Sequence, residues 1–243
     1  MTALIELKKI LVEAAVICEM EGLCDGFGHI TVRVPGTDNI LMTPQGRPGE
    51  TTVENIITLN LQGEKISGQA KRNTEFPIHT CIYRVRNDVQ SIVHVHPPKA
   101  IAFSIAGKEI FPIRFGDMNF SPSVPIFGEP GTHTYIDSDE LGNGMARVLG
   151  KGCAVIIRGH GIVTVGESIE SACLNAVNLE KLAEIQFMAS MLLLSKAVKD
   201  DFQSPALWIP PAQQDGEDNI ARIQKRKWSF YLSKLNKYLN KGA

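Results

Sequence analysis

Cysteine is scarce in this sequence and shows no pairing pattern. The five cysteines are odd in number and widely spaced, and no C-x-x-C pair occurs. This spacing argues against both a disulfide framework and a cysteine zinc site, because each needs cysteines in matched or closely spaced sets. We therefore expect mostly buried thiols in a reducing compartment, and hence a cytoplasmic protein.

Long apolar runs and basic clusters are also missing. No run approaches the length needed to span a bilayer, and the first residues show helical periodicity instead of an apolar signal segment. The 25 basic and 26 acidic residues give a net charge of -1. The one basic triplet, Lys225-Arg226-Lys227, is interpreted as a solvated helix face. The composition predicts a protein with no nucleic-acid and no membrane partner.

No linker divides the chain. The 243 residues contain no Pro/Gly/Ser-rich boundary and no repeat, and they suffice to bury a large core. We predict one main domain over residues 1–200. Residues 201–243 are expected to form a tail and a helix that pack on this domain or on a neighbouring subunit.

Hydrophobic periodicity predicts helices and short strands. The helices are expected at residues 4–21, 74–85, 138–149, 168–194 and 218–239. The strands are expected at residues 29–34, 40–42, 58–61, 65–66, 91–96, 153–157 and 162–165. Residues 101–130 are interrupted by Pro and Gly, which predicts further short strands joined by a loop.

The strand at residues 91–96 carries two histidines on one face. Side chains alternate along a strand, so His94 and His96 point the same way. Pro97 and Pro98 end the strand directly after them. This geometry suits a divalent metal, although an isolated pair is equally often two ordinary strand histidines. Only a third and a fourth ligand would make a site.

Glu75 and His160 are the candidates for those further ligands. Glu75 lies at the start of a predicted helix, where the helix dipole favours a carboxylate, and His79 falls on the same face one turn later. His160 stands between Gly159 and Gly161 in a strand pattern, where a bulge is expected. Together with the strand pair they suit an imidazole-rich divalent site with room for a substrate oxygen.

A glycine-rich turn at residues 25–28 leads into a strand with a polar stripe. His29, Thr31 and Arg33 share one face of this strand, beside a bend where backbone can approach a ligand. His29 and Arg33 are candidates to bind a substrate carboxylate. The phenylalanines of residues 111–127 would suit a planar ring, although a core role is the more common one for such residues.

Five segments, in order, resemble the motifs of the class II aldolase/adducin family over roughly residues 5–190. They are GHITVR at residues 28–33, MTPQG at residues 42–46, Glu75, HVH at residues 94–96 and RGHGIVTVG at residues 158–166. The resemblance implies an α/β fold, a three-layer α/β/α sandwich with a mostly antiparallel central sheet. It also implies a homotetramer that acts on a small-molecule substrate, with sites at the subunit interfaces.

The same resemblance implies a metal site. His94, His96 and His160 would bind a divalent ion, Zn(II) or Mn(II), and Glu75 would be the catalytic acid/base and sometimes a fourth ligand. The retained H-x-H argues against the adducin-like branch, which keeps the fold without needing the metal.

The chain departs from the sugar-phosphate aldolases of this family. Those enzymes hold the phosphate with an Asn, a Thr-Gly turn and a Ser-Ser pair. At the corresponding places this chain has His29, Gln45-Gly46 and Asn73-Thr74. These residues remain candidates for binding substrate, but a phosphorylated sugar is disfavoured.

A second departure concerns the proton donor. The family's aldolases use a tyrosine after the H-x-H strand, and residues 99–130 contain none. Tyr135, or Tyr231 from a neighbouring subunit, could replace it, although neither aligns by motif.

The G-H-x-[ST]-x-R form resembles the branch that decarboxylates hydroxylated aromatic carboxylates. We therefore predict a metal-dependent carbon–carbon lyase that decarboxylates such a compound through an enolate-like intermediate. Three alternatives stay open. They are an aldolase acting on a sugar phosphate or hydroxy-keto acid, an iron oxygenase on the same scaffold, and a metal-free adducin-like interaction module.

Overall fold

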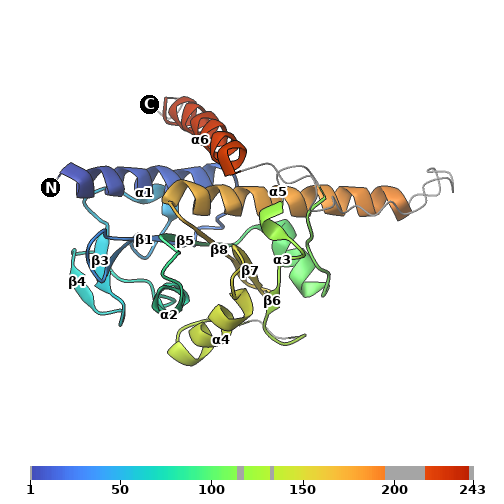
Figure 1. Ribbon diagram of the computed structural model, residues 1–243, viewed down its shortest axis with the longest axis horizontal. Coiled ribbons are helices and arrows are strands. Elements are labelled where there is room, and N and C mark those ends of the chain that lie inside the picture. The colour runs from blue at the N-terminus through green and yellow to red at the C-terminus, as the bar shows by residue number, and fades with distance from the viewer. Residues whose placement is uncertain (1, 114–117, 132–133, 195–216, 241–243) are drawn as a thin grey trace.

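The central sheet is the frame on which the other elements are arranged. Figure 1 shows a computed structural model, which describes residues 2–113, 118–131, 134–194 and 217–240. Across these ranges the sheet has eight strands in the order β4-β3-β2-β1-β5-β8-β7-β6. The strands are β1 (His29–Arg33), β2 (Asn39–Met42), β3 (Ile57–Asn60), β4 (Lys65–Ser67), β5 (Ser91–Val95), β6 (Ile126–Phe127), β7 (Ala154–Ile157) and β8 (Gly161–Gly166). Only the β6–β7 pair within these ranges is parallel, which confirms the mostly antiparallel sheet.

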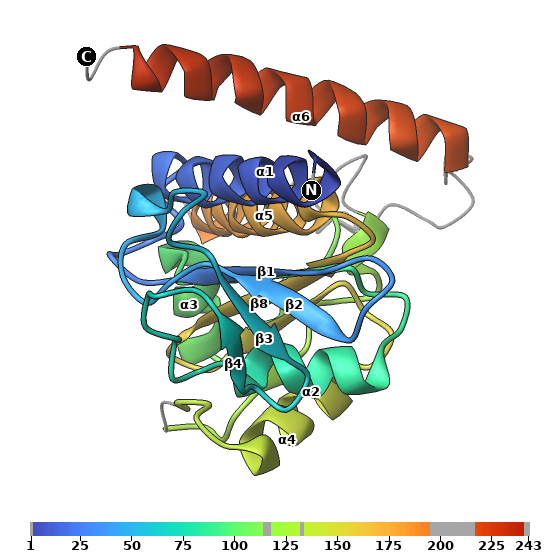
Figure 2. The ribbon, with the colours of Figure 1, turned by 90° about the vertical axis from the view of Figure 1, so that its left-hand side faces the viewer.

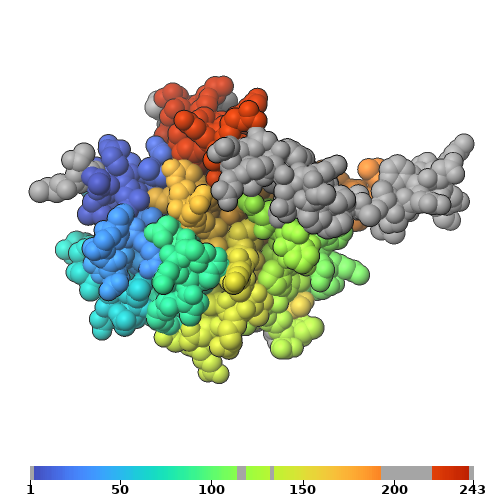
Figure 3. All heavy atoms as spheres, in the orientation of Figure 1, coloured from blue at the N-terminus to red at the C-terminus, as the bar shows by residue number. Residues whose placement is uncertain are grey.

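Helices cover both faces of the sheet and give the three expected layers. The α-helices are α1 (Thr2–Met20), α2 (Pro77–Val85), α3 (Pro98–Ile105), α4 (Asp139–Leu149), α5 (Ile169–Leu194) and α6 (Glu217–Leu239). Figure 2 shows α1 and α5 on one face of the sheet and α2 and α4 on the other. The last helix, α6, packs on α1 and α5 and forms the ridge at the top of Figure 3. None of the helices in the described ranges has the length and apolar character to cross a bilayer.

Two apolar clusters, one on each face of the sheet, hold the layers together. Ile30 and Val93 pack toward α1 and α5, whereas Ile92 and Val163 pack toward α2 and α4. The β-branched strand residues suit these pleated, buried surfaces. Burial of each such side chain stabilises the fold by about 1.5–3 kcal/mol. The sheet is therefore fixed from both sides.

The pairing of β1, β5 and β8 brings distant polar residues together. His29 on β1 lies opposite His94 on β5, and His94 in turn lies opposite Val163 on β8. Because strand side chains alternate, His29, Thr31 and His94 all face the layer that contains α2. This part of the sheet carries the candidate site.

The structure corrects the prediction for the segment after the H-x-H strand. Residues 98–105 form helix α3, where the sequence favoured strands and a loop. Pro98 occupies the first helical turn, where its fixed φ favours a helix. The Glu180 carboxylate on α5 accepts hydrogen bonds from the Lys99 and Ala100 backbone N–H groups, both at 3.0 Å. This stabilisation comes from a residue far along the chain, so local sequence did not reveal it.

Two local predictions near the candidate ligands also need correction. Helix α2 begins at Pro77 instead of residue 74, so Glu75 lies in the turn that precedes the helix. His160 lies in the tight turn between β7 and β8 instead of in a bulge, and Gly159 provides the positive φ of 65° that this turn needs. The helix predicted at residues 138–149 is confirmed as α4, and the Ser138 side chain caps it by accepting a hydrogen bond from Leu141 N.

Candidate metal centre

Three histidines meet where β5 ends and the β7–β8 turn begins. The potential ligand atoms of His94, His96 and His160 all lie within 4.8 Å of one another. The Nε2 atoms of His94 and His96 are 3.1 Å apart. The structure therefore brings together the three histidines that the sequence proposed as metal ligands.

The other ring nitrogen of each histidine is bound to an acceptor. His94 Nδ1 contacts the Ile162 carbonyl oxygen at 3.0 Å, and His160 Nδ1 contacts the Thr134 carbonyl oxygen at 2.8 Å. His96 Nδ1 contacts Asp25 Oδ1 at 2.8 Å. Carbonyl and carboxylate oxygens only accept, so each Nδ1 carries the proton and donates it. The Nε2 atoms of the three rings are left facing one another.

This arrangement fits a divalent cation. Burial lowers the pKa of His94 and of His160, which keeps these rings in the neutral form that binds metal. Converging lone pairs repel one another unless a cation lies between them. Three imidazoles with fixed second nitrogens are the usual donor set of a catalytic divalent site, and they leave positions free for substrate.

Glu75 stands beside the three histidines. Its Oε1 lies 3.6 Å from His160 Nε2, and its Oε2 lies 3.8 Å from His94 Nε2. The Ile136 backbone N–H donates to Oε1 at 3.4 Å. Burial raises the pKa of Glu75, while the neighbouring His160 opposes the shift. The carboxyl group is thus placed to exchange a proton or to act as a fourth ligand.

Two further histidines adjoin Glu75: His29 lies next to its carboxyl group, and His79 lies next to His29. His29 is almost completely buried, and its Nε2 lies 3.9 Å from Glu75 Oε2. Its Nδ1 is 2.6 Å from His79 Nε2. Burial, with a smaller contribution from nearby histidines, lowers the pKa of His29 to about 3, so the ring is neutral. The sequence pointed to His79 only through its one-turn spacing from Glu75, and its part in the cluster was missed.

The loop residues predicted to bind substrate make different contacts within this chain. Asn73 Oδ1 accepts a hydrogen bond from Glu75 N at 2.9 Å, so Asn73 positions the glutamate. The exposed Thr74 hydroxyl is hydrogen-bonded to the Tyr135 hydroxyl. Gln45 and Gly46 form an exposed turn after β2, which is tied down by Gln45 N donating to the Lys71 carbonyl at 3.0 Å.

Within this chain, Arg33 and Tyr231 make contacts away from the centre, and the contribution of Tyr231 from a neighbouring subunit stays a prediction. The Arg33 guanidinium donates to the carbonyls of Val89 at 2.9 Å and Tyr83 at 2.6 Å, which holds it in the connection between α2 and β5. The buried Tyr231 hydroxyl accepts a hydrogen bond from Lys181 Nζ at 2.5 Å, in the packing of α6 on α5. Both side chains thus have structural contacts within this chain.

Two partly exposed aromatic rings flank the histidines. Phe27 stacks on His96 with ring centroids 6.3 Å apart, and Tyr135 stacks on His160 at 6.1 Å. Phe27 is 65% exposed and Tyr135 is 48% exposed. Phe27 and the supporting Asp25 both come from the glycine-rich turn, and the sequence gave no signal for their roles beyond that turn.

Comparisons with known proteins identify the family of this chain. The sequence profile of the Class II Aldolase and Adducin N-terminal domain matches residues 9–187. A 3,4-dihydroxyphthalate decarboxylase of Arthrobacter keyseri is 29% identical over 192 residues, which are 70% of this chain and 73% of that protein. Alpha-adducin of Rattus norvegicus is 31% identical over 170 residues, which are 66% of this chain but only 22% of the adducin.

A solved structure extends the likeness to nearly the whole chain. The L-fuculose 1-phosphate aldolase of Glaciozyma antarctica PI12 superposes with a TM-score of 0.72 at 26% identity and covers 98% of this chain and 91% of its own. The fold, the ordered motifs and the matched profile agree. The chain therefore belongs to the class II aldolase and adducin family.

Proposed function

We propose that this protein is a metal-dependent lyase that decarboxylates a hydroxylated aromatic carboxylate. The observation that carries the proposal is the convergence of three imidazole Nε2 lone pairs beside the buried carboxyl group of Glu75. The similarity to a 3,4-dihydroxyphthalate decarboxylase supports the choice of substrate class.

His94, His96 and His160 would hold the ion, Zn(II) or Mn(II), through Nε2. A divalent ion bound there would act as a Lewis acid on a substrate oxygen and stabilise the negative charge left when the C–C bond breaks. Ile162, Asp25 and Thr134 keep the three rings in the tautomer that this role needs.

Glu75 is the proposed proton donor. The Glu75 carboxyl gives its proton to the ring carbon that carries the carboxylate. The C–C bond then breaks, and its electron pair returns to the ring as carbon dioxide leaves. Glu75 regains a proton from water. Its raised pKa keeps a larger fraction protonated near neutral pH than in an exposed glutamate. Asn73 fixes the Glu75 backbone by accepting from its N–H, and the Ile136 N–H donates to the carboxyl group itself.

The surroundings favour a planar substrate. Phe27 and Tyr135 present partly exposed ring faces beside His96 and His160. Aromatic faces of this kind stack on flat rings, each contact stabilising by about 0.5–1.5 kcal/mol. The neutral His29 carries no charge that would attract a phosphate.

Carbon dioxide release from 3,4-dihydroxyphthalate and related hydroxyphthalates tests the proposal. We expect release that a chelator abolishes. The Glu75→Gln variant should lose about 10²- to 10⁴-fold in kcat while it keeps its metal, because the amide cannot donate a carboxyl proton. The exposed α4 variant Glu140→Gln serves as the control and should retain full activity. Activity confined to phosphorylated ketoses, with an aldehyde product, would instead identify an aldolase.

A further inference from the structure

One nitrogen atom facing the candidate centre has no hydrogen-bond partner among the residues that the structure describes. This atom is the buried His29 Nε2, and Glu75 Oε2 lies 3.9 Å from it. A buried polar atom of this kind costs about 1–3 kcal/mol unless a ligand satisfies it. The atom therefore points to a contact that forms only when a ligand is bound.

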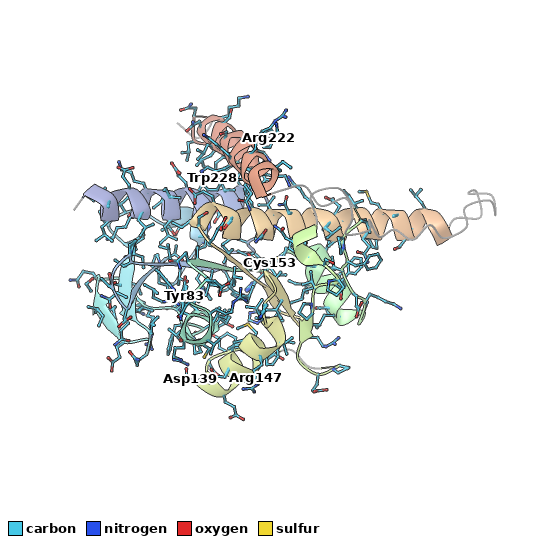
Figure 4. All side chains as sticks on the ribbon, viewed as in Figure 1. Tyr83, Asp139, Arg147, Cys153, Arg222 and Trp228 are labelled. Atoms are coloured by element: carbon cyan, nitrogen blue, oxygen red, sulfur yellow. The ribbon has the colours of Figure 1, made fainter. Side chains whose placement is uncertain are left out.

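Behind His29, a chain of hydrogen bonds runs into the protein interior. His29 Nδ1 lies 2.6 Å from His79 Nε2, and His79 Nδ1 lies 2.7 Å from Thr31 Oγ1. Thr31 Oγ1 lies 3.0 Å from the Tyr83 hydroxyl, which donates to the Gln90 carbonyl oxygen at 3.4 Å. Figure 4 shows Tyr83 in the interior of the protein. We call these four residues, His29, His79, Thr31 and Tyr83, the histidine relay.

The Gln90 carbonyl gives the relay a direction. A carbonyl oxygen only accepts, so the Tyr83 hydroxyl donates to it, the Thr31 hydroxyl donates to Tyr83, and His79 Nδ1–H donates to Thr31. His29 Nδ1–H then donates to His79 Nε2, and all four contacts are made. The reverse direction makes only three of them, because the Tyr83 proton is then used toward Thr31. It would also bury an unpaired His29 Nε2–H, which is rare in proteins.

The geometry points to His29 Nε2 as the acceptor for an un-ionised hydroxyl group of the substrate, with His79, Thr31 and Tyr83 as positioning residues that fix its tautomer. This inference rests on the proposed function. It replaces the expected contact between His29 and a substrate carboxylate, since a lone pair facing a carboxylate would repel it. The Glu75 carboxylate, whose Oε2 lies on the same side of the His29 ring as Nε2, also only accepts when it is ionised, so it would repel a substrate carboxylate as well.

The tautomer can be read directly by nuclear magnetic resonance. In protein labelled with ¹⁵N-histidine and loaded with Zn(II), we expect His29 to be protonated at Nδ1 and bare at Nε2. Tyr83→Phe removes the acceptor of the Thr31 hydroxyl, which must then donate to His79 Nδ1 and reverse the relay. The variant should therefore show His29 Nε2–H. Tyr135→Phe makes the same change outside the relay and should leave the tautomer unaltered. Nε2–H in the wild type, or no change in Tyr83→Phe, would overturn the inference.

Binding of substrate ethers tests the contact itself. The Glu75→Gln variant should not convert the substrate. In this variant we compare the binding affinity of 3,4-dihydroxyphthalate with that of each of its two mono-O-methyl ethers. One ether should bind roughly 10- to 100-fold more weakly, because it cannot donate to His29. Adding Tyr83→Phe should reduce that loss to less than about threefold, since Nε2–H can donate to an ether oxygen. A purely steric loss would persist in both backgrounds and would contradict the inference.

The two proposals fail separately. If no carbon dioxide is released and the parent phthalate does not bind, the proposed function and this contact are both wrong, whereas the tautomer measurement still decides whether the relay exists. If carbon dioxide is released but both ethers bind as well as the parent compound, only the role of His29 is overturned.

Discussion

At the scale of single residues, the hydrogen bond that each histidine makes through Nδ1 decides whether its Nε2 can bind a cation. Two of the three acceptors are backbone carbonyls, of Ile162 and Thr134, and the third is the side chain of Asp25. Asp25 is thus the supporting contact that a single substitution can remove. Its hydrogen bond orients the His96 ring and leaves Nε2 as the atom that can bind the ion.

We predict that Asp25→Ala weakens divalent-metal affinity by about 10- to 100-fold, the usual cost of losing a partner of a ligating histidine. Competition with a chromophoric chelator measures this affinity. Asp38→Ala, in the exposed turn before β2, is the matched control and should bind as tightly as the wild type. Equal affinity of Asp25→Ala and wild type would show that Asp25 does not support a ligand.

The residues of the centre were predictable from sequence in unequal degree. His94 and His96 follow from strand alternation alone, and the ordered motifs added Glu75 and His160. Asp25 and His79 were missed because their roles depend on which segments meet in space, and local periodicity carries no such information. Arg33 was proposed to bind substrate because it shares a face with His29. Its long side chain instead reaches the carbonyls of Val89 and Tyr83.

At the scale of elements, the β7–β8 hairpin must come very close to the end of β5. A Cβ atom added to Gly161 would lie 2.6 Å from the Val95 carbonyl oxygen and 2.8 Å from His96 Cδ2. Such distances are shorter than van der Waals contact, so any side chain would push the hairpin away from β5. The glycine therefore lets His160 approach the H-x-H pair.

Gly161→Ala should reduce the free energy of unfolding by about 1–3 kcal/mol, as overpacking usually does. It should also lower metal affinity, because the turn carries His160 while β5 leads into His96. Urea unfolding and metal titration measure the two effects. Gly144→Ala on α4 faces only the flexible end of the Phe127 ring and the Arg147 side chain, and it should leave metal affinity unchanged. Unaltered metal binding in Gly161→Ala would contradict the close approach.

Elements with strong local signals were predicted well, and those fixed by distant contacts were not. The Ser138 cap and the periodic pattern specified α4 from sequence. Helix α3 depends on the Glu180 carboxylate of α5, which lies 80 residues further along the chain from Ala100. The Arg158–His160 turn looked like a bulge because the strands on either side of it read as one interrupted strand.

At the scale of the whole molecule, a group of buried neutral histidines links stability to pH. Burial lowers the pKa of His29, His79 and His94 below the usual 6.5. In the unfolded chain these rings take up protons below about pH 6.5, whereas in the fold they do not. The unfolded state then binds more protons, so stability falls as pH falls.

We predict that the metal-free protein loses stability between pH 6.5 and pH 5 by up to about 1.4 kcal/mol per pH unit for each such histidine. The raised pKa of Glu75 acts in the opposite direction, but it is one group against these three histidines and His160, whose pKa burial also lowers. Urea unfolding at several pH values measures the slope. His29→Asn should reduce the slope of stability against pH by the contribution of about one bound proton, which is about 1.4 kcal/mol per pH unit. A free energy of unfolding that is constant from pH 7 to pH 5 would refute the inference that these buried rings are neutral in the fold.

The C-terminal half of α5 extends beyond the sheet (Figure 1). Its exposed surface carries several large apolar side chains. Phe187, Met188, Met191 and Leu192 are between 49% and 63% exposed. Contiguous apolar surface of this kind marks an association site, and we expect it to contribute to a homotetramer.

We predict that the wild type sediments as the expected homotetramer and that Phe187→Glu combined with Met191→Glu shifts it to smaller species, because the introduced charges cannot be buried at low cost. Sedimentation velocity measures the distribution. Phe230→Glu, an equally exposed change on α6 at 60%, is the control and should leave the tetramer intact. A wild-type protein that sediments as a monomer would exclude this association.

The most direct test of the account is the divalent-metal content of the protein purified without chelator. We predict about one Zn(II) or Mn(II) ion per chain in the wild type, and its loss in His96→Gln and in His160→Gln with the fold preserved. Elemental analysis with circular dichroism measures both properties. A wild type that binds no divalent ion even after metal is added, or histidine variants that keep a full complement, would contradict the assignment of His94, His96 and His160 as ligands.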